Sequence, residues 1–330
     1  ARAGPAGGPA PVELGDAARP ARRAGAASQG AAERARVVFV CGAGRSGTTL
    51  LTDMLGVHGE LAPLYETEFI TDLAREIGRF RRPAAVMSIV NRWLERWQNY
   101  DEHVDKGANE QFVHGAHFFG GLADSLPSLL LGGARRLCRS LANGGSGVQA
   151  LAEFCDAIFA EHLRREGKSV VVNKTPSYSE ILPLLAQMFP GAKVLHCIRD
   201  GRDVACSIVQ RRFGPRTIEQ SGLWWASRVQ RAVDWGRANP DLYKEVRYER
   251  LVRESRQELS QVLRFLGLAD QAVPMLHRYG RTTTVDGGRM GAWRSLPRAE
   301  LLAFEGHAGE LLEALGYRDS PRGGPDSPPP

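Results

Sequence analysis

The stretch from Arg36 to Leu55, RVVFVCGAGRSGTTLLTDML, constrains the fold of this chain more than any other part of the sequence. Residues 37–41 form a short apolar and β-branched run, which is typical of a buried strand in a parallel sheet. Glycines interrupt this run, and an apolar periodicity that indicates a helix begins at Gly47. Backbone N–H groups and the positive end of the helix dipole would then converge on one point. The sequence therefore predicts an anion site for a phosphate-like group.

The loop differs from the common triphosphate-binding loop at one position. That loop reads G-x-x-x-x-G-K-[ST], and its lysine reaches the β- and γ-phosphates while the Ser or Thr holds Mg²⁺. Gly42 and Gly47 have the required spacing here, but Thr48 stands in the lysine position and the basic residue, Arg45, lies inside the loop. An enzyme that moves a γ-phosphoryl group would lack its main positive clamp. A ligand with one 5′-phosphate and a singly charged transferable group, bound without metal, suits this loop better.

Composition sets wide limits on the class of protein. The chain has 330 residues, enough for a full core, and a net charge of +6, half of it within residues 1–36. This bias is too small to predict nucleic acid as a partner. No apolar run approaches the roughly 18 residues of a membrane span. The five cysteines are scattered without a C-x-x-C pair, which disfavours zinc and favours a reducing, cytoplasmic compartment. A lumenal or membrane-anchored location is the alternative if a targeting leader has been removed.

Three composition zones divide the chain. Residues 1–34 and 319–330 contain few large apolar residues, so we expect a disordered leader and a disordered tail around a folded body at 35–318. Within the body, residues 80–165 are mostly helical by pattern and are expected to be an insertion that interrupts the sheet after its first strand. Further strand-like runs alternate with helical patterns at 169–173, 193–198 and 245–248. This alternation predicts an α/β fold with a parallel sheet and helices on both faces.

A second candidate site follows the 193–198 run. Arg199 stands at the carboxyl end of this predicted strand, where open α/β sheets bind ligands. Ser207 lies on a predicted helix at 203–210, so a strand–turn–helix geometry can turn both side chains toward one pocket. A guanidinium and a hydroxyl suit a phosphate monoester. Arg202 and Asp203 are expected to form a structural ion pair.

Together these motifs resemble those of sulfotransferases that use 3′-phosphoadenosine 5′-phosphosulfate (PAPS), above all the tyrosylprotein and heparan branches and bacterial relatives. The segment GAGRSGTTLL is similar to the family's 5′-phosphosulfate loop. The resemblance implies a P-loop-like sulfotransferase fold, PAPS as co-substrate, no metal, and transfer of a sulfuryl group to a hydroxyl of a glycan, a tyrosine or a small metabolite. The loop residues implied to bind the donor are Gly44, Arg45, Ser46, Gly47, Thr48 and Thr49.

The resemblance extends to the 3′-phosphate and adenosine side of the donor. It implies that Arg199 and Ser207 bind the 3′-phosphate. Arg211, one helical turn beyond Ser207, matches a further PAPS-contacting arginine of the tyrosylprotein branch. Tyr248 is implied to approach the adenosine.

A late segment resembles the loop that closes on the 3′-phosphate in this family. Residues 286–296 read DGGRMGAWRSL, with Gly288, Gly291 and Trp293 placed as in G-x-x-G-x-W. The Arg-Lys pair that precedes the first glycine in cytosolic sulfotransferases is absent. We therefore expect backbone contacts from this loop to the donor rather than side-chain contacts.

The resemblance also implies the catalytic residues. Lys174 stands in the family's K-[TSD]-P context and, with Arg45, would stabilise the group in flight. Glu66 aligns with the base of the E-x-H-F and E-T-R motifs, and Glu68 adds a second acid where relatives have His or Arg. A surface lysine and two solvated acids are the structural alternatives. His58 is the next candidate base, because cytosolic small-molecule sulfotransferases use a histidine, though at a different place in the chain.

Two other functions remain open from the sequence. One is a P-loop kinase or NTPase, against which the missing Walker lysine argues. The other is a nucleotide-binding module that has lost catalysis. The insertion is expected to shape the acceptor pocket, but it matches no motif that would identify the acceptor.

Overall fold

A computed structural model describes residues 34–79, 82–98, 122, 124–211, 213–280 and 290–317. The predicted tail and all of the predicted leader except Arg34 lie outside these residues. Arg34 itself belongs to the described body, because its guanidinium contacts the backbone oxygen of Met188 and donates to Gln149 Oε1 at 2.8 Å.

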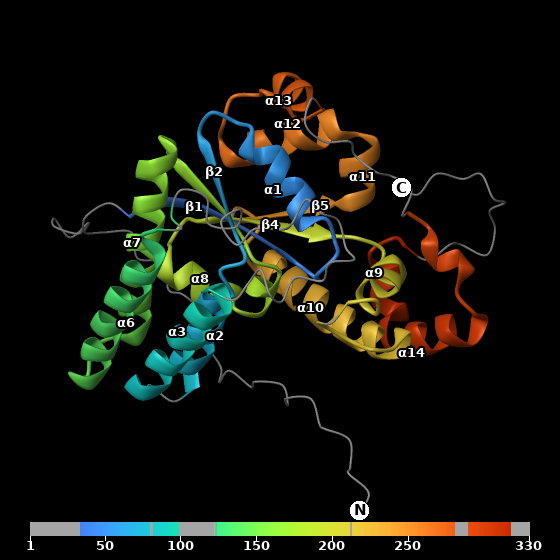
Figure 1. Ribbon diagram of the computed structural model, residues 1–330. Helices are drawn as coiled ribbons and strands as arrows, with labels where there is room; N and C mark the ends of the chain where they lie inside the picture. Colours follow the sequence, from blue (N-terminus) through green and yellow to red (C-terminus); the bar gives the residue numbers. More distant parts are fainter. Residues whose placement is uncertain are drawn as a thin grey trace, which may run out of the picture. The chain divides into compact units, whose positions relative to one another are not determined.

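One five-stranded sheet organises the described chain, and its strands are all parallel in the order β2-β3-β1-β4-β5 (Figure 1). The strands are β1 (Arg36–Gly42), β2 (Leu61–Tyr65), β3 (Val170–Lys174), β4 (Lys193–Ile198) and β5 (Tyr243–Arg247). The predicted parallel sheet is confirmed. The pattern missed β2, since Pro63 interrupts a short run with no β-branched residue. Proline is tolerated there because β2 lies at the sheet edge. The sequence analysis placed the insertion after the first strand of the sheet. It follows the second strand of the chain, β2, instead.

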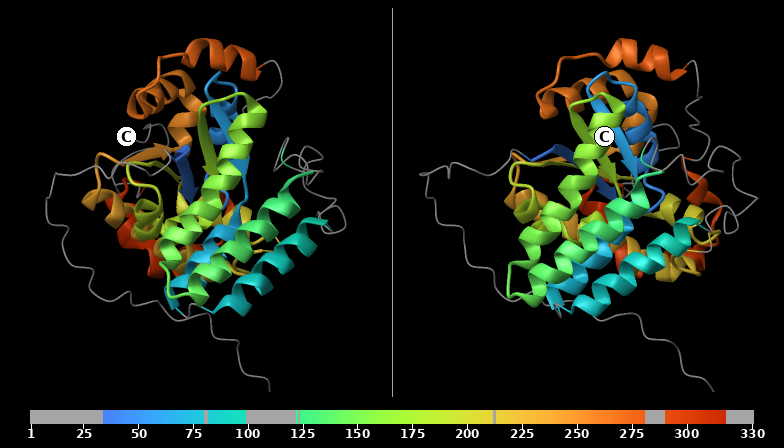
Figure 2. Two further views of the ribbon diagram at one scale, coloured as in Figure 1. Left: turned by 90° about the vertical axis from the view of Figure 1, so that its left-hand side faces the viewer. Right: turned by 60° about the vertical axis from the view of Figure 1, so that its left-hand side comes forward.

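Helices cover both faces of the sheet, as the alternating pattern predicted (Figures 1 and 2). On one face, α1, α11, α12 and α13 pack against Val38 and Val40 of β1. On the other face, residues of α2, α3, α6, α7 and α8 belong to one apolar cluster with Val37 and Phe39. Both sides of β1 are thus buried, which explains its continuous apolar run.

The bounds of the helices are as follows: α1 (Thr48–Gly56), α2 (Glu68–Arg79), α3 (Pro83–Gln98), α6 (Leu126–Ala142), α7 (Gly147–Glu166), η3 (Pro176–Glu180), α8 (Leu182–Met188), α9 (Gly201–Ile208), α10 (Ile218–Ala238), α11 (Tyr248–Arg253), α12 (Ser255–Leu266), α13 (Ala272–Gly280), η4 (Ala292–Ser295) and α14 (Arg298–Ala314). The helices α9, α10 and α14 share a third apolar cluster around the fully buried Trp225.

The described helices of the predicted insertion belong to the main core. Phe154 and Phe159 of α7 are buried in the same cluster as the sheet residues Phe39 and Val171. On α6, a Cβ atom at Gly133 would lie 2.1 Å from Phe154 Cδ2, so glycine permits the close crossing of α6 and α7. The described part of the insertion therefore covers one face of the sheet. Whether it also shapes the acceptor pocket stays a prediction.

The strand register brings the predicted site residues to one edge. Lys174 is the register partner of both Val40 in β1 and Tyr65 in β2, and Gly42 is the partner of Cys197 in β4. The segments that follow these strands therefore leave the sheet at a common carboxyl edge. Ligands of open α/β sheets bind at this edge.

Candidate active site at the carboxyl edge of the sheet

The loop between β1 and α1 depends on two glycines. Gly42 lies so close to β4 that a Cβ atom would come within 2.4 Å of the Cys197 backbone oxygen. Gly47 is the N-cap of α1 with φ 89°, and its Cβ would lie 2.5 Å from the Tyr248 ring. Both positions therefore require the absence of a side chain.

The end of α1 that faces the loop meets the requirements of an anion site. No side chain caps the helix at Gly47, so its first N–H groups, including those of Thr48 and Thr49, have no side-chain acceptor from the cap residue. The Ser46 hydroxyl is fully buried, and no group within the described part of the chain forms a hydrogen bond with it. The chemistry of these groups fits the 5′-phosphosulfate of the implied donor.

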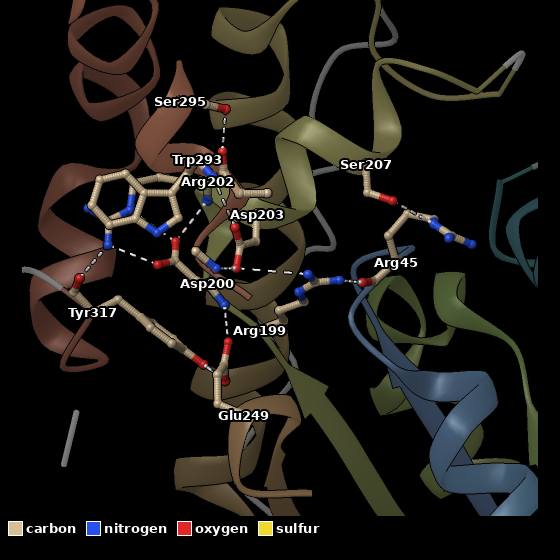
Figure 3. Close-up of polar contacts among 12 residues, drawn as sticks. Arg45, Arg199, Asp200, Arg202, Asp203, Ser207, Glu249, Trp293, Ser295 and Tyr317 are labelled. Carbon is tan, nitrogen blue, oxygen red and sulfur yellow. Dashed lines mark hydrogen bonds and ion pairs between the residues drawn. The ribbon is translucent and has the colours of Figure 1, made fainter. Parts of the chain in front are cut away.

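Arg45 joins the loop to the second predicted site (Figure 3). It adopts a left-handed conformation with φ 72°, and its Nε donates to Ser207 Oγ at 3.0 Å. Its backbone oxygen accepts a hydrogen bond from Arg199 Nη1 at 3.3 Å. The structure thus brings Arg45, Arg199 and Ser207 together. The Arg45 guanidinium lies with the residues predicted for the 3′-phosphate, and its role at the sulfuryl group stays a prediction.

Tyr248 supports the loop and Arg199 at the same time. It is the first residue of α11, and its ring fills the space beside Gly47. The Arg199 guanidinium carbon lies 4.3 Å from the centre of the Tyr248 ring, within the range of a cation–π contact. Only 8% of Tyr248 is exposed, so most of its surface already serves this packing. Its predicted contact with adenosine remains a prediction.

The ion pairs at the start of α9 differ from the pair that the sequence analysis expected between Arg202 and Asp203. Asp203 does not pair with Arg202, as the sequence analysis expected, but lies 3.8 Å from Arg199 Nη2, one helical turn away. Arg202 instead pairs with Asp200 at 2.8 Å, because Asp200 is the N-cap of α9 and also accepts the Arg202 backbone N–H. The i,i+4 spacing of Arg199 and Asp203 was the signal available in the sequence.

The late loop contacts α9 through Asp203. The backbone N–H groups of Gly291 and Trp293 donate to the two carboxylate oxygens of Asp203 at 2.8 and 3.2 Å. The Trp293 ring lies against Arg202, with 3.6 Å between the guanidinium carbon and the ring centre. The predicted donor contacts of Gly291 and Trp293 stay predictions, and Gly288 lies outside the described residues.

Arg211 lies in a turn. The helix α9 spans 201–208 and not 203–210, and the Arg211 N–H donates to the Ile208 oxygen at 2.9 Å just beyond the helix end. Arg211 is therefore not on the next helical turn after Ser207. Its contact with the donor remains a prediction.

Glu66 and Lys174 form an ion pair at the ends of β2 and β3. The Lys174 side chain is 2% exposed and the Glu66 side chain is 35% exposed. The Lys174 ammonium also lies 5.3 Å from the centre of the Tyr65 ring. The predicted base and the predicted stabilising cation are thus in direct contact, with the carboxylate on the more accessible side.

A buried polar network fixes the backbone around this pair. The Thr67 hydroxyl lies 2.6 Å from the Tyr178 hydroxyl, 2.9 Å from Asn173 Nδ2 and 3.0 Å from the Thr175 hydroxyl. Tyr178 also donates to Asn173 Oδ1 at 2.5 Å. This network ties the segment after β2 to the N-K-T-P-S-Y segment after β3. Such satisfied networks give a site one defined geometry.

Glu68 begins α2 and is held apart from the ion pair. It accepts a hydrogen bond from Ser177 Oγ at 2.5 Å. Burial, with a smaller contribution from the nearby Glu66 carboxylate, raises the pKa of Glu68, although the Ser177 bond acts in the opposite direction. The second acid is therefore more readily protonated than an ordinary glutamate.

His58 lies at the opposite edge of the sheet. It follows α1 and precedes Leu61, the first residue of β2, and its Nδ1 accepts the Glu60 N–H at 3.1 Å. Desolvation by burial lowers the pKa of His58, a residue that is 1% exposed. This position removes His58 from the candidates for the base.

The sequence did not indicate that an aromatic residue, Trp224, lies beside the phosphate loop. A Cβ atom at Gly44 would lie 3.5 Å from the ring of Trp224 on α10. Arg228 covers this ring at 4.6 Å and pairs with Glu180 of η3 at 2.9 Å. Tryptophan at a helical spacing indicates core packing, so the sequence alone gave no reason to place Trp224 at the loop.

Solved structures show a similar fold. The sulfotransferase domain of the Synechococcus PCC 7002 olefin synthase aligns with a TM-score of 0.56 and 22% identity, covering 89% of this chain and 99% of that domain. The sulfotransferase domain of the curacin biosynthetic pathway aligns with a TM-score of 0.52 and 17% identity, covering 87% and 99%. Fold and loop together define the chain as a P-loop-like α/β protein.

Sequence comparison identifies the family within this class. The pattern that defines the Sulfotransferase family matches residues 37–272, and the chain belongs to this family. It is 25% identical over 275 residues to an uncharacterized protein of Aquifex aeolicus, covering 79% of this chain and 30% of that protein. It is 22% identical over 241 residues to the protein-tyrosine sulfotransferase of Drosophila melanogaster, covering 70% and 38%. The chain thus spans about a third of the length of these two relatives.

Proposed function

We propose that this protein transfers a sulfuryl group from PAPS to an acceptor hydroxyl. The observation that carries the proposal is the Glu66–Lys174 ion pair at the carboxyl edge of the sheet. The pair is adjacent to the phosphate loop, because the Thr175 N–H bonds to the Val40 oxygen of β1 at 3.0 Å. We therefore infer that a base and a cation lie next to the candidate phosphosulfate site.

The donor would be bound by groups from two segments, the loop that leads into α1 and the segment 199–207. The first N–H groups of α1 and the buried Ser46 hydroxyl suit the 5′-phosphosulfate. The Arg199 guanidinium and the Ser207 hydroxyl suit the 3′-phosphate, and Arg45 lies between the two sites.

The chemistry requires one proton transfer and stabilisation of one leaving oxygen. PAPS supplies an activated sulfuryl group, whose bond to the 5′-phosphate oxygen breaks as the acceptor oxygen bonds to sulfur. Glu66, the exposed partner of the ion pair, removes the acceptor proton. Lys174, which is buried below it, stabilises the charge that develops on the leaving oxygen.

The rival functions are less consistent with the site. A kinase would need the lysine that Thr48 replaces. A module without catalysis would have no need of a buried lysine paired with an accessible carboxylate, an arrangement that is costly unless it is used.

The acceptor and the location belong to the same proposal. A tyrosine acceptor has support from relatives that are protein-tyrosine sulfotransferases. Glycans and small metabolites remain the alternatives. We propose a cytoplasmic location, with a lumenal or membrane-anchored one as the alternative if a targeting leader has been removed. Among the helices that the structure describes, none combines the length and apolar character needed to cross a bilayer.

Transfer from labelled PAPS tests the proposal. The protein is incubated with ³⁵S-labelled PAPS and separate pools of tyrosine peptides, glycans and small hydroxyl compounds, and products are identified by the added mass of SO₃. We expect label in one pool with the wild type and strongly reduced label with Lys174→Met. Transfer of labelled phosphate from ATP, without transfer from PAPS, would replace the proposal with the kinase alternative.

A further inference from the structure

We infer that Asp203 is a positioning residue of the donor site, which fixes the turn at 290–293 and the Arg199 guanidinium relative to each other. The part that concerns the donor rests on the proposed function. The part that concerns the turn depends only on the contacts of the described residues.

Asp203 joins the segment around the start of α9, which includes Arg199, to the turn at 290–293, which lies some 90 residues later in the sequence (Figure 3). Its Oδ2 accepts the Gly291 N–H at 2.8 Å and lies 3.8 Å from Arg199 Nη2. Its Oδ1 accepts the Trp293 N–H at 3.2 Å. The side chain is 2% exposed, so these partners surround a carboxylate that is almost completely withdrawn from water.

Among the residues that the structure describes, the turn has little other support. None of the residues of η4, which follows Gly291, is buried, and the bonds from Arg294 to Gly291 and from Leu296 to Trp293 stay within the turn itself. Its further contact with α9 is the Trp293 ring on Arg202. A segment with so few buried contacts opens locally unless a specific bond holds it. Asp203 supplies two such bonds.

Arg199 connects Asp203 to the phosphate loop. Its Nη1 donates to the Arg45 backbone oxygen, and its guanidinium lies on the Tyr248 ring that packs against Gly47. The Asp203 charge therefore balances the cation that is proposed to bind the 3′-phosphate, and it aligns this cation with the loop. Only a carboxylate can accept the two N–H groups on separate oxygens, because an amide offers one acceptor oxygen.

Amide hydrogen exchange tests whether Asp203 holds the turn. In Asp203→Asn, the Gly291 and Trp293 amides should exchange about tenfold faster or more than in the wild type, since one charge-assisted bond is lost. The matched control is Asp234→Asn on the exposed surface of α10, where the carboxylate contacts Gln230 and Arg237. This control should leave both amides unchanged. Equal exchange in Asp203→Asn and the wild type would overturn the inference.

Affinity for the desulfonated product, 3′-phosphoadenosine 5′-phosphate, tests the donor part. Calorimetry should show binding weakened about tenfold in Asp203→Asn. Faster exchange with unchanged product affinity would limit Asp203 to holding the turn and overturn its role in the donor site. If the wild type fails to bind the product, the proposed function falls, whereas the exchange data still decide the role of Asp203 at the turn. If Asp203→Asn does not unfold cooperatively, Asp203→Ser takes its place in both measurements.

Discussion

At the scale of single residues, Glu66 combines an unusual backbone conformation with a side chain that is the proposed catalytic base. Glu66 has φ 52°, a left-handed conformation that costs a non-glycine residue about 1–2 kcal/mol. Its N–H bond to the Lys174 oxygen at 2.8 Å and the Thr67 network that follows hold it there. Strained residues of this kind cluster at functional sites. No sequence pattern predicts this conformation for a glutamate, whereas the motif did single out the residue.

Glu66→Gln should slow sulfuryl transfer by about 10²–10⁴-fold with little change in PAPS binding, because the amide keeps the shape but cannot remove a proton. A more acidic acceptor should restore much of the rate, since its proton leaves without a base. Lys174→Ala should also be slow, but it should respond to a better leaving group on the donor rather than to the acceptor. Single-turnover rates against acceptor pKa measure the difference.

The control for this prediction is Glu68→Gln, which changes the neighbouring acid. If Glu68→Gln is inactive and Glu66→Gln is active, the base has been assigned to the wrong glutamate. If both variants keep full rates, neither carboxylate is the base.

The raised pKa of Glu68 predicts how its replacement changes stability with pH. Such a carboxyl contributes stability below its unfolded pKa, and this contribution is lost as the pH rises through its folded pKa. Glu68→Gln should therefore unfold at a higher temperature than the wild type near pH 8, and this advantage should vanish by about pH 4. Thermal unfolding across this pH range is the measurement. An advantage that grows toward acid pH would contradict the assigned shift.

At the scale of elements, the sequence predicted those strands whose apolar pattern matches their burial in the sheet. The predicted run 193–198 has the bounds of β4, and β1, β3 and β5 agree within about two residues. β2 was missed because its Pro63 is permitted by an edge position that only the sheet order reveals. The pairing of Asp203 was also missed, because its partners Gly291 and Trp293 are some 90 residues away.

Gly47→Ala should destabilise the connection of loop and helix. Alanine is strained at φ 89°, and its Cβ would collide with the Tyr248 ring, so we expect a loss of about 1–3 kcal/mol in the free energy of unfolding. Gly59→Ala is the matched control, since no atom of another described residue outside its immediate chain neighbours lies within 4 Å of its Cβ position. Urea denaturation measures both variants. Equal stability of the two would contradict the role given to Gly47.

At the scale of the whole molecule, the described body has apolar clusters on both faces of one sheet. The sequence predicted helices within 80–165, but it could not show that α3, α6 and α7 complete the core on one face. Helical periodicity shows that one face of a helix is apolar, but it does not show which other element packs on that face. The term insertion therefore describes a position in the sequence and not a separate unit.

Phe154→Ala tests whether these helices and the sheet unfold together. Phe154 is 2% exposed in the core, and its truncation should cost about 3–5 kcal/mol. Tryptophan fluorescence and far-ultraviolet circular dichroism should then show one common transition, shifted to lower urea. Separate transitions, with the sheet more stable than the helices, would show that the two parts fold independently.

The central claim is that the carboxyl edge binds a nucleotide with a 5′-phosphate and a 3′-phosphate without metal. The most direct measurement is calorimetric titration of 3′-phosphoadenosine 5′-phosphate in EDTA, compared with ATP, for the wild type and Arg199→Ala. We predict binding of the bisphosphate in preference to ATP, and a loss of about 1.5–3 kcal/mol in Arg199→Ala because a charge-assisted phosphate contact is removed. A strict Mg²⁺ requirement, a preference for ATP, or unchanged affinity in Arg199→Ala would contradict the claim.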